Sequence, residues 1–184
     1  MKALRNGKSH RQAGFTLIDM LFVVALIGLL SSLAIPGLMR ARGAAQAASA
    51  LGTIRVINSG QLSFAISCGL GFYAKTLPHL RMPAPGSTEG FIEDMLTGAA
   101  VVQKSGYEFS MAGMDFPAAP ATCNGIGAGG TSTSYALVGD PVDPNIAMPR
   151  FFGTNSDGVI YEHTTTLVDD MPVSGSPPIG VPLK

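Results

Sequence analysis

Charged residues are scarce in this chain. Asp, Glu, Lys and Arg make up 13% of its 184 residues, about half the share found in a typical soluble domain. Glycine and proline are abundant instead, with 23 and 13 residues. This composition argues against a coiled coil, against disorder driven by charge and against nucleic-acid binding. The length suits one ordinary domain with an appendage.

Most of the chain is also short of positive charge. Lys and Arg together number twelve, as do Asp and Glu. Four of the basic residues lie before residue 15, where there is no acidic residue: Lys2, Arg5, Lys8 and Arg11. The remainder therefore has eight basic and twelve acidic side chains, which is a net charge of about −4 at neutral pH. A body of this charge has no electrostatic reason to bind DNA.

No set of residues predicts an active site. The glycine-rich run at 125–130 resembles a phosphate-binding loop only superficially, because no strand precedes it and the Lys-Ser/Thr pair is missing. His79 and His163 belong to no motif that would link them to a nucleophile, so both are expected at the surface. The sequence therefore predicts a protein that is not an enzyme.

The longest apolar run occupies residues 15–35, which are 21 residues with a single charge, at Asp19. As an α-helix this run would be about 30 Å long, the thickness of the hydrocarbon core of a bilayer, so it can cross a membrane once. The basic residues before it predict a cytoplasmic N-terminus and an external position for the chain after Pro36. Arg40 and Arg42, which follow the run, reduce the difference in positive charge between its two sides.

Three kinds of segment compete for this run: a secretory signal peptide, an uncleaved signal anchor, and a leader that is removed before the run. A signal peptide has a shorter apolar core, of about 7 to 15 residues, and small residues after it, which Ser31, Ser32 and Ala34 imitate only loosely. Asp19 disfavours the first two kinds. An acidic residue inside a membrane costs about 2.5 kcal/mol or more and usually marks a function or a partner.

A resemblance to a known family rests on GFTLID at residues 14–19, with a short basic leader before it and an apolar run after it. This pattern resembles the class III signal of type IV prepilins and type II secretion pseudopilins, closely over about residues 7–60. The resemblance implies that prepilin peptidase, a membrane aspartyl peptidase, cuts after Gly14 on the cytoplasmic side and methylates Phe15. The family usually has Glu where this chain has Asp19, which is shorter by one methylene.

The resemblance also gives Asp19 and Pro36 a place in assembly. Asp19 would pair with the amine of Phe15, in its own chain or in a neighbouring subunit, and so fix the axial register of a filament. Pro36 removes one backbone hydrogen bond and is expected to kink the helix.

Beyond Pro36 the apolar residues recur at spacings of three and four, which predicts one helix with a single apolar stripe. The stripe consists of Ala47, Ala50, Leu51, Ile54, Ile57, Phe64, Ala65 and Cys68, with Gln61 in its gap. We expect residues 54–68 to face the core of the same chain. Residues 37–53 are expected to contact other subunits, because they lie too near the membrane for a small head to cover.

After Gly69 the pattern changes to turns and short runs. A helical turn or two is predicted at 88–96. Strands are predicted at 107–111, 134–139, 150–154 and 159–163, with a hairpin turn at 155–158 between the last two. A short antiparallel meander over the second half of the helix gives an α+β fold, which the resemblance also implies. The Pro-, Gly- and Ser-rich tail at 172–184 is expected to be loosely ordered.

The expected divisions of the chain are a leader at 1–14, a transmembrane and assembly helix at 15–36, an amphipathic helix at 37–68 and a small head at 69–184. The two cysteines, Cys68 and Cys123, would both lie outside the cytoplasm, where an oxidising compartment favours a disulfide. A loop of about 55 residues would make this disulfide worth roughly 4 kcal/mol. Two unpaired cysteines are the alternative.

Asp169 and Asp170, with Asp157, are candidate calcium ligands, since some pseudopilins carry a calcium loop near the C-terminus. Their spacing matches no recognisable pattern, so a solvated acidic loop is favoured and no cofactor is predicted.

The function implied is that of a structural subunit of a helical filament, either a type IV pilus or a type II secretion pseudopilus. Its partners would be prepilin peptidase, other pilin or pseudopilin subunits and an inner-membrane assembly platform, with energy from a separate cytoplasmic ATPase. It would cross the inner membrane of a bacterium once, with its head in the periplasm or at the cell surface. The alternative is a single-pass, membrane-anchored module that binds an external ligand. An exported hydrolase is disfavoured because no catalytic set is present.

Overall fold

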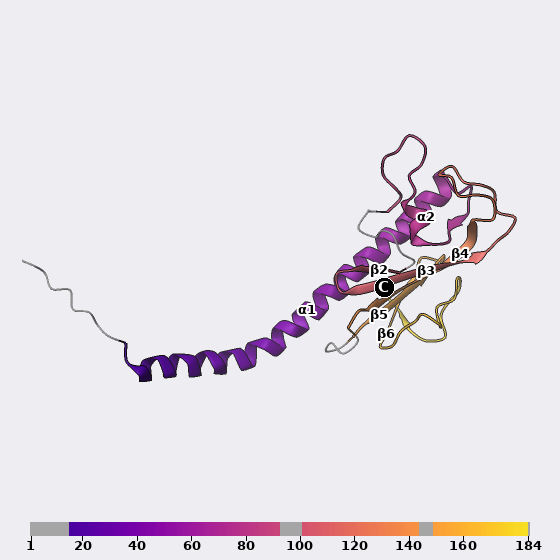
Figure 1. Ribbon diagram of the computed structural model, residues 1–184. Helices are drawn as coiled ribbons and strands as arrows, with labels where there is room; N and C mark the ends of the chain where they lie inside the picture. The colour runs from indigo at the N-terminus through magenta and orange to yellow at the C-terminus, as the bar shows by residue number, and fades with distance from the viewer. Residues whose placement is uncertain (1–14, 93–100, 144–148, 184) are drawn as a thin grey trace, which may run out of the picture. The chain divides into compact units, whose positions relative to one another are not determined.

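The computed structural model describes residues 15–92, 101–143 and 149–183. Its elements follow the order α1, β1, α2 and then β2 to β7 (Figure 1). The chain divides into two compact units, Met1–Leu38 and Met39–Lys184. The described part of the first unit holds the beginning of α1. The second unit holds the rest of that helix, α2 and the sheet.

Helix α1 runs from Leu17 to Ser67 and continues through Pro36. One 18-residue window of it has a mean hydropathy of 2.4, and none of that window is buried. By length and composition the helix can therefore cross a membrane.

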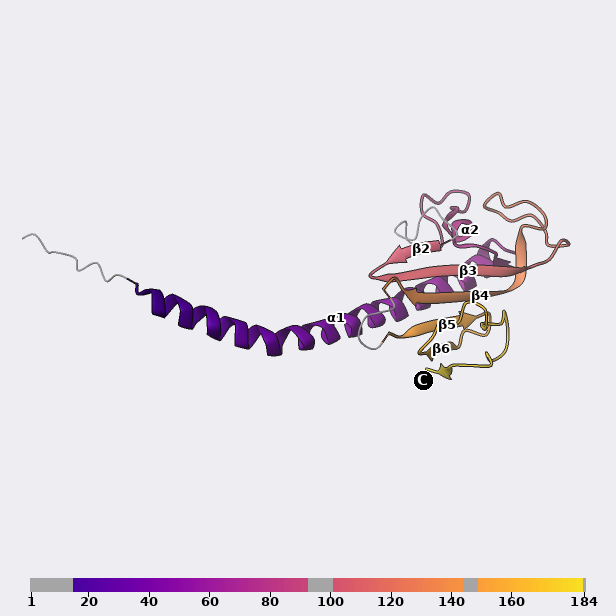
Figure 2. The ribbon, with the colours of Figure 1, turned by 60° about the horizontal axis from the view of Figure 1, so that its bottom comes forward.

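The seven described strands join in one antiparallel sheet with the order β2-β3-β4-β5-β6-β7, and β1 pairs with β4 beside this path. From β2 to β7, strands that follow one another in the sequence lie next to one another, so this part of the sheet is a meander (Figure 2). The bounds are β1 Tyr73–Ala74, β2 Val101–Lys104, β3 Tyr107–Asp115, β4 Thr131–Pro141, β5 Phe151–Asn155, β6 Ile160–His163 and β7 Val181–Pro182.

The four strand predictions are confirmed as β3, β4, β5 and β6, of which β3 and β4 are longer than expected. The hairpin turn between β5 and β6 is also present. In it the Gly158 N–H donates to the carbonyl oxygen of Asn155 at 2.9 Å. Gly158 has a φ of 76°, a conformation that glycine adopts without strain.

The helical turn predicted at 88–96 is wrong for residues 88–92, which form no helix, while residues 93–96 lie outside the described residues. Here Ser87 Oγ accepts a hydrogen bond from the Glu89 N–H and donates to the Glu89 carbonyl, a local turn that competes with helical bonding. The structure has a short helix elsewhere, α2 at Leu77–Arg81, with a proline in its first turn.

The second half of α1 packs against one face of the sheet and forms the main core with it. Its buried residues are Ala47, Ala50, Thr53, Ile54, Ile57, Gly60, Gln61, Phe64 and Ala65, so the predicted stripe is confirmed, with Leu51 half-buried. From the sheet they meet Tyr107, Phe109, Leu137 and Phe152.

One expectation about this helix needs correction. Residues 37–53 were expected to contact other subunits, yet three of them, Ala47, Ala50 and Thr53, are buried in the chain's own head. The reason is that the turn between β2 and β3 reaches back along α1. A Cβ added to Gly106 in that turn would lie 2.5 Å from the side-chain nitrogen of Gln46. For the exposed residues 37–42 the expectation stays a prediction.

The opposite face of the sheet carries a smaller apolar cluster. It contains Val138, which neighbours the core residue Leu137 in β4, together with Tyr161, Leu167 and Met171. The segment after β6 supplies much of this cluster and is held in place by Asn155, whose Nδ2 donates to the carbonyls of Pro172 at 3.2 Å and Gly175 at 2.7 Å. The tail, which its composition predicted to be loosely ordered, makes these contacts and ends by pairing β7 with β6.

Candidate functional site

Thr16 holds the start of α1. Its carbonyl oxygen accepts hydrogen bonds from the backbone N–H groups of Asp19 and Met20, at 3.2 and 3.4 Å, and the helix begins at the next residue, Leu17. Thr16 is therefore the N-cap residue. Phe15 precedes the cap, lies outside the helix and is 75% exposed.

Asp19 completes the cap from the first turn of the helix. Its Oδ2 accepts from the Thr16 N–H at 3.1 Å and from the Thr16 hydroxyl at 2.5 Å, while the Asp19 N–H donates to Thr16 Oγ1 at 3.3 Å. The two residues thus form a reciprocal capping box. The third residue of the helix, Asp19 here, is usually Glu or Gln in such a box. This role of Thr16 was not among the predictions from the sequence, although T-x-x-D before an apolar run is the signal that identifies it.

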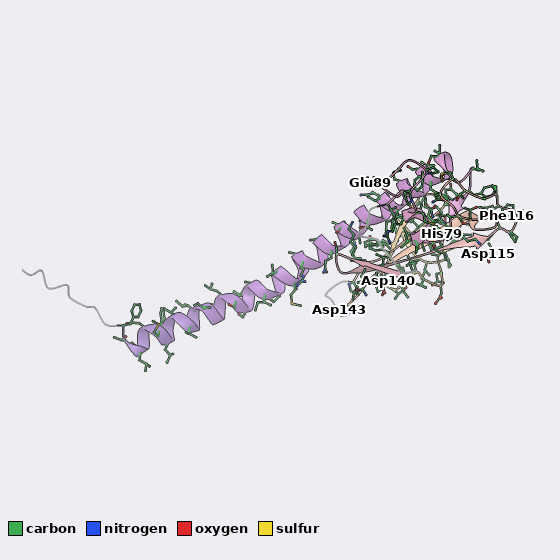
Figure 3. All side chains as sticks on the ribbon, turned by 45° about the horizontal axis from the view of Figure 1, so that its top comes forward. His79, Glu89, Asp115, Phe116, Asp140 and Asp143 are labelled. Atoms are coloured by element: carbon green, nitrogen blue, oxygen red, sulfur yellow. A yellow bond between two sulfur atoms is a disulfide. The ribbon has the colours of Figure 1, made fainter. Side chains whose placement is uncertain are left out.

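The side chains that follow on α1 are apolar and uncovered in the single chain, and Figure 3 shows them projecting from the helix. Those with large exposed areas before Leu38 are Leu17, Ile18, Met20, Leu21, Phe22, Val23, Val24, Leu26, Ile27, Leu29, Leu30, Leu33 and Ile35. Asp19 is the one charged residue among residues 15–38. A surface of this kind requires lipid or other helices around it.

The predicted processing and assembly residues fall in the first unit. Gly14 lies outside the described residues, whereas Phe15, Asp19 and Pro36 are described. Within the described residues, the hydrogen bonds of the Asp19 carboxylate go to Thr16 and not to a basic side chain.

A comparison with models of known protein families matches residues 9–35 to the prokaryotic N-terminal methylation motif. The chain carries this methylation motif. It is the class III signal of type IV pilins and pseudopilins, so the resemblance drawn from GFTLID is confirmed. Neither the curated proteins nor the solved structures gave a match to this chain.

The methylation motif supports a processed subunit of the pilin or pseudopilin kind, and it implies in general terms processing by prepilin peptidase. Together with the apolar helix it fits a membrane-anchored subunit. Both residues of the capping box, Thr16 and Asp19, lie inside the methylation motif. The cap is therefore placed next to the residues that processing would act on.

The head beyond the methylation motif contains the predicted disulfide, which joins Cys68 to Cys123 with a Cα–Cα distance of 4.9 Å. The Cys123 N–H also donates to the Cys68 carbonyl at 3.2 Å. Cys68 directly follows α1, and Cys123 lies in the long connection between β3 and β4. The bridge therefore ties that connection to the end of the helix.

The three aspartates considered as calcium ligands have separate surroundings. Asp157 Oδ2 accepts a hydrogen bond from the Gly175 N–H at 2.6 Å, while Asp169 and Asp170 are exposed in the segment after β6. In the part of the chain that the structure describes, no group of three or more His, Cys, Asp or Glu residues could hold a metal ion.

His79 and Asp140, both labelled in Figure 3, are among the titratable side chains of the head whose pKa values are displaced. His79, expected at the surface, is half-buried, and burial and then the charge of Lys75 lower its pKa. Burial raises the pKa of Asp140, with the Glu108 carboxylate adding to the effect and the hydrogen bond from Thr166 opposing it. Both groups make the stability of the head depend on pH.

An open cleft of about 670 Å³ lies beside the second half of α1 and is lined also by residues of β1, β4 and the β5–β6 turn. Three polar side chains in this region bond to one another. The Tyr135 hydroxyl donates to Asn58 Oδ1 at 3.0 Å, and Asn58 Nδ2 donates to Thr154 Oγ1 at 3.1 Å.

Proposed function

We propose that this chain is a structural subunit of a helical filament, either a type IV pilus or a type II secretion pseudopilus. It would be cut after Gly14, methylated on Phe15 and assembled through the apolar part of α1. One observation carries the proposal: the methylation motif runs directly into a helix whose apolar side chains are uncovered in the single chain. In a filament, the helices of neighbouring subunits would cover these side chains.

The proposed topology places the basic leader in the cytoplasm and the head outside, in the periplasm or at the surface of a bacterium. The four basic residues before residue 15 support this orientation. The Cys68–Cys123 disulfide also supports it, because disulfides persist in oxidising compartments.

Assembly would move α1 from lipid to a bundle of like helices. Because both environments are apolar, hydrophobicity alone supplies little driving force, and close packing with a specific polar contact must direct the process. Asp19 is the residue able to provide that contact, by pairing with the amine that cleavage creates on Phe15. The partners would be prepilin peptidase, an inner-membrane assembly platform and further subunits, with a cytoplasmic ATPase as the source of energy.

Mass spectrometry of the chain purified from membranes tests the processing step. The mature chain should begin at methylated Phe15, and a Gly14→Val variant should keep its leader, because the branched side chain blocks close approach to the scissile bond. A purified chain that begins at Met1, or after Ala34, would contradict the proposal.

Two further assays separate the filament systems and test the alternative. A deletion strain and the same strain complemented with the gene are compared by electron microscopy for surface fibres and by a substrate-secretion assay. Loss of fibres indicates a pilus, and loss of secretion indicates a secretion pseudopilus. A deletion strain that still forms fibres and still secretes substrate would favour the anchored binding module.

A further inference from the structure

The capping box of Thr16 and Asp19 uses two of the four backbone donors that a helix longer by one turn would need. If α1 extended toward the leader, the Thr16 N–H would donate to the carbonyl of Gln12 and the Asp19 N–H to that of Phe15. In the structure the Thr16 N–H donates to Asp19 Oδ2 at 3.1 Å, and the Asp19 N–H donates to Thr16 oxygens. Because both donors are satisfied locally, backward growth of the helix gains no hydrogen bond from either.

This arrangement leaves Phe15 outside the helix, one residue before the cap. The bond that the proposed processing breaks is the one on the N-terminal side of Phe15. A helical peptide bond is surrounded by the neighbouring turns, and its carbonyl oxygen is occupied by an N–H four residues later. A peptidase can reach a peptide bond only where the backbone is free of such a turn.

We propose that Thr16 is a positioning residue for processing. Its cap makes α1 begin at Leu17 and so keeps the bond before Phe15 accessible to the peptidase. The inference rests on the proposed cleavage after Gly14. In that hydrolysis, water adds to the Gly14 carbonyl carbon, the bond to the Phe15 nitrogen breaks, and a proton passes to that nitrogen. The products are a carboxylate on the leader and a free amine on Phe15.

The cap also serves the precursor before it is cut. Until cleavage the Phe15 nitrogen is part of a peptide bond, so it cannot be the positive partner of Asp19. The Thr16 N–H and hydroxyl give the carboxylate two donors in the meantime. Buried carboxylates are tolerated where donors satisfy them, so Thr16 reduces the cost of Asp19 near the membrane.

The test measures cleavage of the full-length chain in membrane vesicles that contain an overproduced prepilin peptidase. Three variants are compared with the parent: Thr16→Val, which has the branched shape but no hydroxyl acceptor, Thr16→Ser, which keeps the cap, and Asp19→Asn, which keeps an acceptor oxygen and loses the charge. We expect kcat/KM to fall about fivefold for Thr16→Val and to stay within about twofold for the other two.

The loss should fall on KM and leave kcat nearly unchanged. When only part of the substrate has the competent backbone, its apparent affinity drops by that fraction, whereas the bound complex reacts as before. A loss of membrane insertion would instead lower the amount of substrate in the vesicles, which immunoblotting measures directly.

Equal kcat/KM values for Thr16→Val and the parent, with the parent cut after Gly14, would overturn this inference and leave the proposed function standing. A fivefold loss shared by Thr16→Ser would also overturn it, because serine caps a helix as well as threonine does. A parent chain that is not cut after Gly14 at all would instead overturn the proposed function.

Discussion

At the scale of single residues, Asp19 combines two tasks that substitutions can separate. Its carboxylate is the one charge on α1 before Arg40, and its oxygen accepts both donors of Thr16. Those bonds need an acceptor but no charge. The proposed pairing with the Phe15 amine after cleavage does need the charge, because an ion pair in an apolar core strongly penalises misaligned neighbours.

An Asp19→Ala substitution should leave cleavage after Gly14 largely intact and abolish filament assembly. Cleavage survives because Thr16 Oγ1 still accepts from the N–H of residue 19, whereas assembly loses the charge. Asp19→Glu should assemble at least as well as the parent, since its longer side chain reaches the amine more easily. The measurements are the cleaved fraction by mass spectrometry and the filament yield by electron microscopy. Normal filaments from Asp19→Ala would remove the charge from the mechanism.

His79 should make the head less stable as the pH falls. Burial and Lys75 lower the pKa of His79 in the folded state below its ordinary value of 6.5. The unfolded chain then binds the proton more readily, so stability is full above about pH 6.5 and falls as the pH drops toward the folded pKa. Asp140 has the opposite effect. Burial raises its pKa in the folded state, so its contribution makes the head more stable as the pH falls and this carboxylate is protonated.

The comparison that isolates this effect is a His79→Gln variant of a head fragment beginning near residue 40. Between pH 7.5 and pH 5.5 the melting temperature of the parent should fall further than that of the variant. A His163→Gln variant is the control, because the His163 ring pairs with the Thr165 hydroxyl near the surface. Parallel melting curves for His79→Gln and the parent across this range would rule out His79 as the titrating group.

At the scale of elements, the residue pattern predicted the secondary structure of long segments but not that of very short ones. The spacing of three and four in α1 identified the buried stripe from Ala47 to Ala65, and short runs between turn residues predicted β3 to β6. The two-residue strands β1 and β7 have no periodicity of their own, because each is formed only by pairing with a distant partner. The same holds for the tail, whose order depends on hydrogen bonds from Asn155.

Gln61 is the polar residue within the stripe of α1, and it joins the helix to β1. Its Nε2 donates to the Ala74 carbonyl and its Oε1 accepts from the Ala74 N–H, both at 2.9 Å. A Gln61→Leu variant keeps the apolar stripe but leaves both backbone groups of Ala74 buried without partners. Urea unfolding of the head fragment should show a loss of about 2 to 4 kcal/mol.

The matched control is Gln103→Leu, which changes an exposed glutamine of β2 and should alter the free energy of unfolding by less than about 0.5 kcal/mol. Equal stabilities for Gln61→Leu and Gln103→Leu would show that the bonds to Ala74 contribute nothing.

At the scale of the whole molecule, the methylation motif was predictable from a short segment, whereas several surroundings within the head were not. The methylation motif covers residues 9–35, and its signal lies in local sequence, so no knowledge of the fold is needed to recognise it. The contacts of Thr16 were equally local but needed the geometry of the helix start to be noticed. The surroundings of His79 and the cleft beside α1 arise from segments distant in the sequence, which no local pattern encodes.

The Cys68–Cys123 disulfide should contribute roughly 2 to 4 kcal/mol to the stability of the head, because it closes a loop with a sequence separation of 55 in the unfolded chain. A double variant, Cys68→Ala with Cys123→Ala, should have a clearly lower melting temperature than the oxidised parent. Reducing agent should lower the melting temperature of the parent and leave that of the double variant unchanged. Labelling of both thiols in the native protein would contradict the bridge.

The position of the bridge also decides how the head would carry a mechanical load. Tension applied through α1 reaches Cys68 at the end of the helix and passes across the sulfur atoms to Cys123. Residues 69–122, with β1, α2, β2 and β3, lie outside this covalent route and bear none of the pull that it transmits to the later strands. A stretched subunit would therefore lengthen by far less than its number of residues allows, because the bridge removes that whole segment from the extensible chain.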